Sequence, residues 1–292
     1  MLLPGFDYHR PREIKEALAV LADYQDQAAL LAGGTDLLVN MKRKLARPSQ
    51  VVGLEALAGL KEIQVGENEI RLGPMLTATE LAENPEVQSL AGVLALGASR
   101  LGGEQVRNRA TLGGNVVNAR PAADLCLPLL ALEAKALLKS VSDERILDLD
   151  EFFLGPGETA RRPSEMVTAL IVQRESLPVG YGYEKLGLRQ AMEIALVNVA
   201  VKLVLEKDKK TVNKVFISLG AVAPRPILAR EAAGTLAGAE AGEDALKNAA
   251  RKAVSEASPI DDHRGAAWYR KRMIEVLTFR ALKQAWEQAK GA

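Results

Sequence analysis

Apolar residues in the first part of the chain recur with two spacings, those of helices and of short strands. An amphipathic helix is predicted over residues 12–24, where apolar side chains follow the i, i+3, i+4, i+7 spacing. A strand, a tight turn and a helix are predicted over residues 28–45, where a short apolar run meets two glycines and then helical spacing. Further strands are predicted at residues 50–54, 61–65, 69–73, 134–140, 145–150 and 166–172.

Capping signals predict helices in the middle of the chain. Thr77 and Glu80 have the spacing of a capping box, so a helix should begin near Ala78 and stop at Pro85. A second apolar helix is expected over residues 87–96. Residues 152–163 are rich in turn residues and predict a loop.

The second part of the chain changes to long strands and long helices. Valine and leucine alternate over residues 197–205, and the sequence KDKK then leads into a second apolar run at 212–222. This pattern predicts a long antiparallel hairpin. The final ~65 residues contain three helical segments, so we expect an α+β domain after a boundary in the loop at 177–180.

Composition excludes several classes of site. The chain has 292 residues, a net charge of +1, a single cysteine and two histidines. It therefore has no intramolecular disulfide and no cysteine-rich zinc or iron–sulfur site of its own. The balanced charge argues against nucleic-acid binding, and no apolar stretch is long enough for a transmembrane segment. We expect a cytoplasmic protein.

Two glycine pairs are candidates for phosphate binding. Gly33 and Gly34 precede Thr35, and Gly113 and Gly114 follow an apolar run in the same way. Adjacent glycines let backbone N–H groups converge on an anion. Neither pair has the G-x-G-x-x-G or the P-loop pattern. Each pair alone is better explained by a tight turn. Two similar pairs weaken that explanation and also suit a diphosphate bound between two loops, so both interpretations stay open at this point.

Several motifs in order resemble the FAD-binding medium subunit of molybdenum hydroxylases, the family of xanthine dehydrogenase and aerobic carbon monoxide dehydrogenase. They are AGGTDLL, GPMLTATEL, RNRATLGGN with PAADLCLP, YEKLGLRQAMEIALVNVAV, SLGAVAPRP and SPIDDHRGAAWYRKRMIEVLTFRAL. Together they span nearly the whole chain. The resemblance implies an FAD-binding domain of the vanillyl-alcohol-oxidase type over residues 1–177, in two parts of about 1–55 and 56–177. It is followed by a C-terminal α+β domain, an antiparallel sheet with helices, over residues 178–292.

The resemblance also implies which residues bind the cofactor, FAD held without a covalent bond. The loop around the pyrophosphate matches Leu30, Leu31, Ala32, Gly33, Gly34, Thr35, Asp36 and Leu37, and the second loop matches Thr111, Gly113, Gly114 and Asn115. Other matched positions are Thr77, Leu101, Asp124, Val167 and Lys185. Leu101 replaces a position that is often aromatic in the family. Asp124 has an alternative interpretation as a charge at a helix N-terminus.

Two charged residues are candidates for tuning the flavin. Lys185 matches a lysine near the ring, where a cation would stabilise the reduced anionic flavin, although it could also be a solvated strand residue. Glu193 matches a position that is usually aspartate in the family. Tyr183 either borders the ring or is an ordinary hairpin tyrosine. Cys126 is expected to be a small buried residue, and the basic cluster around Arg270 is either a solvated helix face or a docking surface.

The resemblance implies an electron-transfer subunit. Substrate would be oxidised at a molybdenum–pterin site in a large subunit, and two [2Fe–2S] clusters in a small subunit would pass electrons to this flavin. NAD or another acceptor would then be reduced. A stand-alone FAD-dependent oxidoreductase acting on a small substrate is the alternative, and a cofactor-free scaffold is a third hypothesis. Because substrate is contacted by another chain, its identity is not predicted here.

Overall fold

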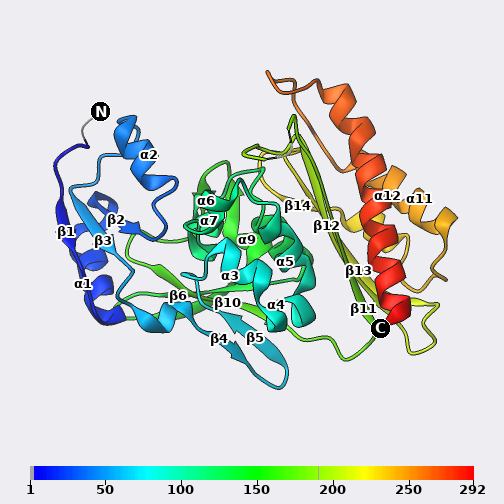
Figure 1. Ribbon diagram of the computed structural model, residues 1–292, viewed down its shortest axis with the longest axis horizontal. Helices are drawn as coiled ribbons and strands as arrows, with labels where there is room; N and C mark the ends of the chain where they lie inside the picture. Colours follow the sequence, from blue (N-terminus) through cyan, green and yellow to red (C-terminus); the bar gives the residue numbers. More distant parts are fainter. Residues whose placement is uncertain (1–2, 190) are drawn as a thin grey trace.

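The computed structural model describes residues 3–189 and 191–292, which form three sheets in a row (Figure 1). The first sheet is small and parallel, with the strand order β1-β3-β2. Its elements are β1 (Asp7–His9), α1 (Ile14–Tyr24), a 3-10 turn (Gln25–Gln27), β2 (Ala28–Leu31), α2 (Leu37–Lys42) and β3 (Gln50–Gly53). The predicted order of helix, strand, turn, helix and strand is confirmed here.

The second sheet is antiparallel, with the order β4-β5-β10-β6-β7. Its strands are β4 (Ile63–Val65), β5 (Glu69–Leu72), β6 (Lys135–Lys139), β7 (Glu144–Asp148) and β10 (Met166–Gln173). Its helices are α3 (Ala78–Glu83), α4 (Pro85–Leu90), α5 (Gly92–Ser99), α6 (Glu104–Arg107), α7 (Leu112–Asn118), α8 (Cys126–Ala131) and α9 (Leu149–Phe152). A 3-10 turn (Ala58–Lys61) and the short hairpin β8 (Phe153–Gly155) and β9 (Glu158–Thr159) complete this part.

Two predictions in this region need correction. The capping box of Thr77 and Glu80 is present, but the single helix expected over 87–96 is two helices that meet at Ala91. The first of them starts earlier, because the Asn84 side chain accepts hydrogen bonds from the first turn and Pro85 occupies the position after it. The loop expected at 152–163 contains the β8–β9 hairpin.

The third sheet has the order β11-β12-β13-β14 and is antiparallel. Its elements are β11 (Val179–Leu186), β12 (Val197–Leu205), β13 (Val212–Gly220), β14 (Ile227–Leu228), α10 (Arg230–Gly234), α11 (Glu243–Ser255) and α12 (Ala267–Gly291). The predicted hairpin and three helical segments are confirmed, and so is the α+β class. No helix among the described residues is long and apolar enough to span a bilayer.

Strand β12 is buried on both of its faces, although its valines alternate along the chain. Val199 and Val201 belong to the core that α11 and α12 cover, whereas Ala200 belongs to the core of the second sheet. Lys202 also lies on the second face, and its ammonium group contacts Glu175 at 2.9 Å and Glu133 at 3.5 Å. The third sheet is therefore packed between its own helices and the middle part of the chain (Figure 1).

Arg270 departs from the solvated-face alternative for the basic cluster, whose other members on α12, Lys271, Arg272 and Arg280, are exposed. Its side chain is buried and donates hydrogen bonds to the carbonyl oxygens of Leu196 and Ala221 and to Asp262 at 2.7 Å. Burial opposes ionisation of Asp262, but hydrogen bonds from the backbone and from Arg270 outweigh it and lower the pKa of this carboxyl to about 2. Arg270 therefore fixes the start of α12 to the sheet.

Helix α12 lies directly on β11 because two glycines of that strand carry no side chain. A Cβ at Gly182 would lie 2.0 Å from the carbonyl oxygen of Ala281, and one at Gly180 would lie 1.8 Å from that of Ala285. Ala281 and Ala285 are themselves fully buried. Small residues on both sides thus set the distance between helix and sheet.

Gly182→Ala should therefore destabilise the protein, because the added methyl group must push α12 away from the sheet. We expect a loss of about 1–3 kcal/mol in the free energy of unfolding, measured by chemical denaturation. Gly59→Ala is the matched control, since a Cβ there meets no atom within 4 Å. Equal stability of the two variants would contradict the close packing described here.

Candidate functional site

A cavity of about 330 Å³ lies between the first sheet and the second. Its walls come from the β2–α2 loop, from the segment that begins α7, and from the start of β10. The volume is within the range of small-ligand pockets. Its lining includes most of the predicted cofactor-binding residues, namely Leu30, Ala32, Gly33, Gly34, Thr35, Asp36, Leu37, Thr111, Gly113, Gly114, Asn115 and Val167.

The two glycine loops meet at a contact that only glycine permits. A Cβ at Gly33 would lie 1.9 Å from the carbonyl oxygen of Arg109, just before the second loop. Gly34 has a φ of +75°, in the left-handed region that other residues rarely adopt. The first loop therefore needs one glycine for close approach and the other for its turn.

Backbone N–H groups of the first loop are available to a ligand. The amides of Gly33, Gly34, Thr35 and Asp36 have no hydrogen-bond acceptor among the described residues. All four residues line the cavity. Unpaired backbone donors are rare in folded proteins and bind water or a ligand. Several successive donors around a turn suit an anion such as a phosphate.

The second loop differs from this expectation, because its amides already have partners. The N–H of Gly113 donates to the carbonyl oxygen of Pro74 at 2.8 Å, and the N–H of Gly114 donates to the hydroxyl of Thr111 at 3.2 Å. A Cβ at Gly113 would lie 2.5 Å from the Pro74 side chain. The second glycine pair therefore serves close packing, and the free donors are concentrated in the first loop.

The other predicted residues take different positions. The side chain of Thr77 completes the capping box with Glu80, and Thr77 pairs with Thr111 in an isolated β-bridge. The side-chain oxygen of Asn115 accepts from the backbone N–H of Leu125 at 3.1 Å. Leu31, Thr77, Leu101, Asp124 and Lys185 do not line this cavity.

Asp124 and Lys185 form a buried ion pair between the middle and C-terminal parts of the chain. The ammonium group of Lys185 lies 2.8 Å from one carboxylate oxygen of Asp124, and the Tyr183 hydroxyl donates to the other at 2.9 Å. The Lys185 side chain is 3% exposed, so the solvated-strand alternative is wrong. Helix α8 begins at Cys126, just after Asp124, and has no side-chain cap, whereas the side-chain hydrogen bonds of the Asp124 carboxylate come from Tyr183 and Lys185 of β11.

Burial controls the ionisation of this group of residues. Desolvation raises the pKa of Asp124, although Lys185 and Tyr183 counteract it, and desolvation and the Asp124 charge raise the pKa of Tyr183 well above its ordinary value. Burial also raises the pKa of the Cys126 thiol, and the expectation of a small buried cysteine is confirmed.

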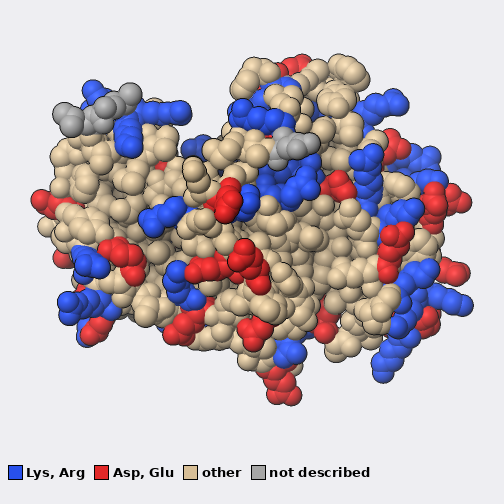
Figure 2. All heavy atoms as spheres, viewed as in Figure 1, with Lys and Arg blue, Asp and Glu red and all other residues tan. Residues whose placement is uncertain are grey.

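A second cavity adjoins this ion pair. Arg100, Gly102, Lys185 and Glu193 line it, and a carboxylate oxygen of Glu193 accepts from the backbone N–H of Arg189 at 2.6 Å. Basic side chains gather on the surface around the β11–β12 connection (Figure 2). The segment 100–115 borders the second cavity at its beginning and the first cavity at its end.

Sequence reasoning missed about half of the first cavity's lining. The missed residues are Leu21, Ala28, Ala29, Asn40, Leu54, Pro74, Met75, Ala110, Val117, Asn118, Arg161 and Met166. Most are apolar residues, and nothing in their local sequence distinguishes them from core. Among the described residues, no group of three or more His, Cys, Asp and Glu side chains could hold a metal ion.

Asp124→Asn should strongly destabilise the protein, because the Lys185 ammonium would stay buried without its counter-charge. Loss of one partner of a buried pair costs about 3–5 kcal/mol. The double variant Asp124→Asn/Lys185→Met should recover most of this loss in chemical denaturation. Glu243→Gln, which removes an exposed pair with Lys247, is the control and should change stability little. An additive double variant would contradict the coupling.

Comparison with known proteins identifies relatives of nearly the full length. Residues 4–173 match the family model of the FAD binding domain in molybdopterin dehydrogenase, and residues 183–285 match that of the CO dehydrogenase flavoprotein C-terminal domain. The chain is 31% identical to the glyceraldehyde dehydrogenase medium chain of Sulfolobus acidocaldarius, with 97% of this chain and 99% of the relative covered. It is 32% identical to the carbon monoxide dehydrogenase medium chain of Hydrogenophaga pseudoflava, with 98% and 99% covered.

The structural comparison agrees with the sequence comparison. A solved structure of carbon monoxide dehydrogenase from Hydrogenophaga pseudoflava, lacking the Mo-pyranopterin moiety of its molybdenum cofactor, contains a chain that superposes with a TM-score of 0.94. The sequence identity is 32%, and the match covers 99% of each chain.

Proposed function

Because this chain belongs to the FAD-binding medium subunits of molybdenum hydroxylases, we propose that its first cavity holds the diphosphate of FAD on the free amides of residues 33–36. The family and the α+β fold predicted from the sequence are confirmed by the matches over both parts of the chain. The domain boundary at residues 177 and 178 stays a prediction. The matched ranges lie on either side of it.

The arrangement of the first loop is the observation that carries this proposal. Four neighbouring residues whose N–H groups lack acceptors line the cavity, and glycine at position 33 permits the close approach to Arg109 while glycine at position 34 permits the left-handed turn. Amides held in place by the fold bind an oxyanion without reorganisation. Bound FAD supplies the hydride and one-electron chemistry, whereas the protein supplies position and electrostatics.

The second cavity is where we propose that the isoalloxazine ring lies. Lys185 and Glu193 line that cavity. Leu101 lies in the sequence between Arg100 and Gly102, which also line it. The Lys185 charge is largely compensated by Asp124, so its effect on a bound flavin is that of a hydrogen-bonded pair and not of an isolated cation. Because the Tyr183 hydroxyl is committed to Asp124, we infer that Tyr183 does not serve as a base for a substrate, which favours electron transfer over the stand-alone alternative.

Electron flow is the remaining part of the proposal. We propose that iron–sulfur clusters of a small subunit deliver electrons to this FAD, that a large subunit holds the molybdenum cofactor, and that NAD or another acceptor takes the electrons. The glyceraldehyde dehydrogenase medium chain is 31% identical to this chain, and the carbon monoxide dehydrogenase medium chain is 32% identical. The sequence similarity of this chain to known medium chains therefore does not indicate which substrate its complex would oxidise. Co-purification from the native source with iron–sulfur and molybdenum subunits tests this assembly, and isolation of the chain alone as an active oxidoreductase would support the alternative.

Gly34→Val should lower the affinity for FAD at least tenfold, because a side chain at a φ of +75° distorts the loop that presents the free amides. Affinity is measured by titrating the apoprotein with FAD and following flavin fluorescence. The visible spectrum of the purified protein gives a second measure of occupancy.

Gly238→Val is the matched control for backbone strain. Gly238 has a φ of +76°, a Cβ at this position would meet no atom within 4 Å, and the residue does not line either cavity. This variant should lose similar stability but keep its FAD affinity. Equal loss of FAD in both variants would show that the effect is general destabilisation, and full FAD binding by Gly34→Val would contradict the assignment of the first loop.

A further inference from the structure

Arg161 is a charged residue on the wall of the first cavity that no sequence motif indicated. It lies in the connection between β9 and β10, next to Arg162. Resting on the proposed function, we infer that Arg161 binds the phosphate of the AMP half of FAD. The inference depends on how its guanidinium group is held and on which of its donors are free.

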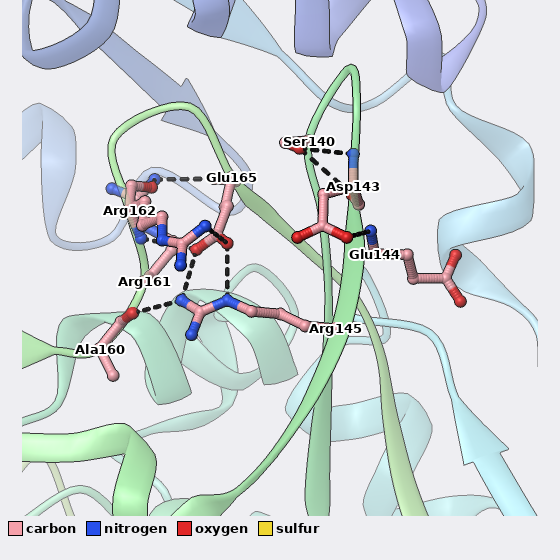
Figure 3. Close-up of polar contacts among 8 residues, drawn as sticks. All are labelled: Ser140, Asp143, Glu144, Arg145, Ala160, Arg161, Arg162 and Glu165. Carbon is pink, nitrogen blue, oxygen red and sulfur yellow. Dashed lines mark hydrogen bonds and ion pairs between the residues drawn. The ribbon is translucent and has the colours of Figure 1, made fainter.

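One nitrogen of the guanidinium group is anchored to the backbone. Nη1 of Arg161 donates to the carbonyl oxygens of Arg162 and Glu165, at 2.9 and 2.8 Å (Figure 3). It also donates to the carbonyl oxygen of Pro163 at 3.3 Å. All three acceptors belong to the turn that follows Arg161, so the turn itself holds the side chain in place. Such anchoring reduces the conformational entropy that a ligand contact would otherwise cost.

Glu165 is the nearest carboxylate in this cluster, but Arg145 occupies it. Arg145 donates to both oxygens of Glu165, at 2.7 and 2.8 Å, and the backbone N–H of Arg162 donates to one of them at 2.7 Å (Figure 3). The Glu165 side chain is only 3% exposed. Among the described residues, no carboxylate lies within 4.0 Å of the Arg161 guanidinium, which is therefore left without an ion-pair partner.

The remaining donors of Arg161 are accessible. Nε and Nη2 have no acceptor among the described residues, and they do not belong to the buried atoms that lack a partner. Solvent therefore reaches them, in a side chain that is otherwise partly buried. Desolvation lowers the pKa of Arg161, although arginine stays charged at any physiological pH.

Charge explains why this cation suits a phosphate. The charged residues on the cavity wall are Asp36 and Arg161, so Arg161 is the single cation among the lining residues. The free amides of the first loop are neutral donors, whereas a diphosphate carries negative charge on both phosphates. A guanidinium group with two free nitrogens matches phosphate oxygens in charge and in geometry.

The AMP half of the cofactor is the half that the proposed function places wholly in the first cavity. Arg161 lines the first cavity, whereas Lys185 and the proposed flavin site belong to the second. Residues of the segment 100–115 line both cavities, Arg100 and Gly102 the second and residues 110–115 the first. Arg161 therefore lies on the cavity away from the proposed ring site, and the inference that it binds the AMP phosphate predicts that FMN, which lacks the AMP half, does not depend on it.

The experiment compares Arg161→Gln, Arg161→Lys and wild-type apoprotein by calorimetric titration with FAD, FMN, ADP and adenosine. Arg161→Gln should weaken FAD and ADP about tenfold, because one charge-assisted contact is lost, and should leave FMN and adenosine unchanged. Arg161→Lys should keep more of the affinity. The dependence of ADP binding on salt concentration should be smaller in Arg161→Gln than in wild type.

Arg162→Gln is the matched control. Its side chain is 63% exposed, lies 3.9 Å from Glu165 and does not line the cavity. This variant should bind FAD and ADP as wild type does. An equal loss in the Arg162 variant would assign the effect to the turn and overturn the inference.

Two further results would overturn the inference in different ways. Wild-type affinity for ADP in Arg161→Gln would show that the guanidinium group does not contact the phosphate. An equal loss of ADP and adenosine binding would show a contact with the adenine ring instead. Both results leave FAD binding by the wild-type protein intact, whereas failure of the wild-type protein to bind FAD would reject the proposed function itself.

Discussion

The contact between Gly33 and the carbonyl oxygen of Arg109 is the constraint on which the site depends. Even one methyl group at Gly33 would lie 1.9 Å from that oxygen, so the two loops can meet only through a glycine. The first loop follows β2 of the first sheet, the second lies between α6 and α7, and the two are about 80 residues apart in the chain. Gly33 and Ala110, on the two sides of their contact, both line the cavity. The contact also holds the turn that leaves four backbone N–H groups without acceptors.

The two glycine pairs look alike in the sequence but have different physical roles. The first pair permits a left-handed turn and a close approach, and its amides stay free. The second pair permits α7 to start against Pro74, and its amides are already bonded within the protein. Neutral donors thus lie on one side of the cavity, while the cation Arg161 belongs to a third segment of its wall. This division of roles suits a diphosphate better than two equivalent loops would.

Local patterns predicted most of the elements, but they did not predict how the sheets bury one another. The β12–β13 hairpin and the α3 cap followed from periodicity and capping residues within a few positions. The second face of β12 carries Ala200 and Lys202, residues that look neutral or exposed in sequence, yet both are buried by the middle of the chain. Nothing in the sequence distinguishes Arg270 from Lys271. In the structure, Arg270 donates to the carbonyl oxygens of Leu196 and Ala221, which are far from it in the chain. Resemblance to the family indicated the glycine loops, whereas Arg161 carried no signal because its relation to them is purely spatial.

Amide hydrogen exchange of the apoprotein, with and without added FAD, tests the central claim most directly. The amides of residues 33–36 should exchange quickly without FAD and become protected when FAD binds, because only then do they acquire an acceptor. The amides of Gly113 and Gly114 should be protected in both states, since their acceptors lie within the protein. Bound FAD with no change at residues 33–36, or with protection appearing only at residues 113 and 114, would contradict the account.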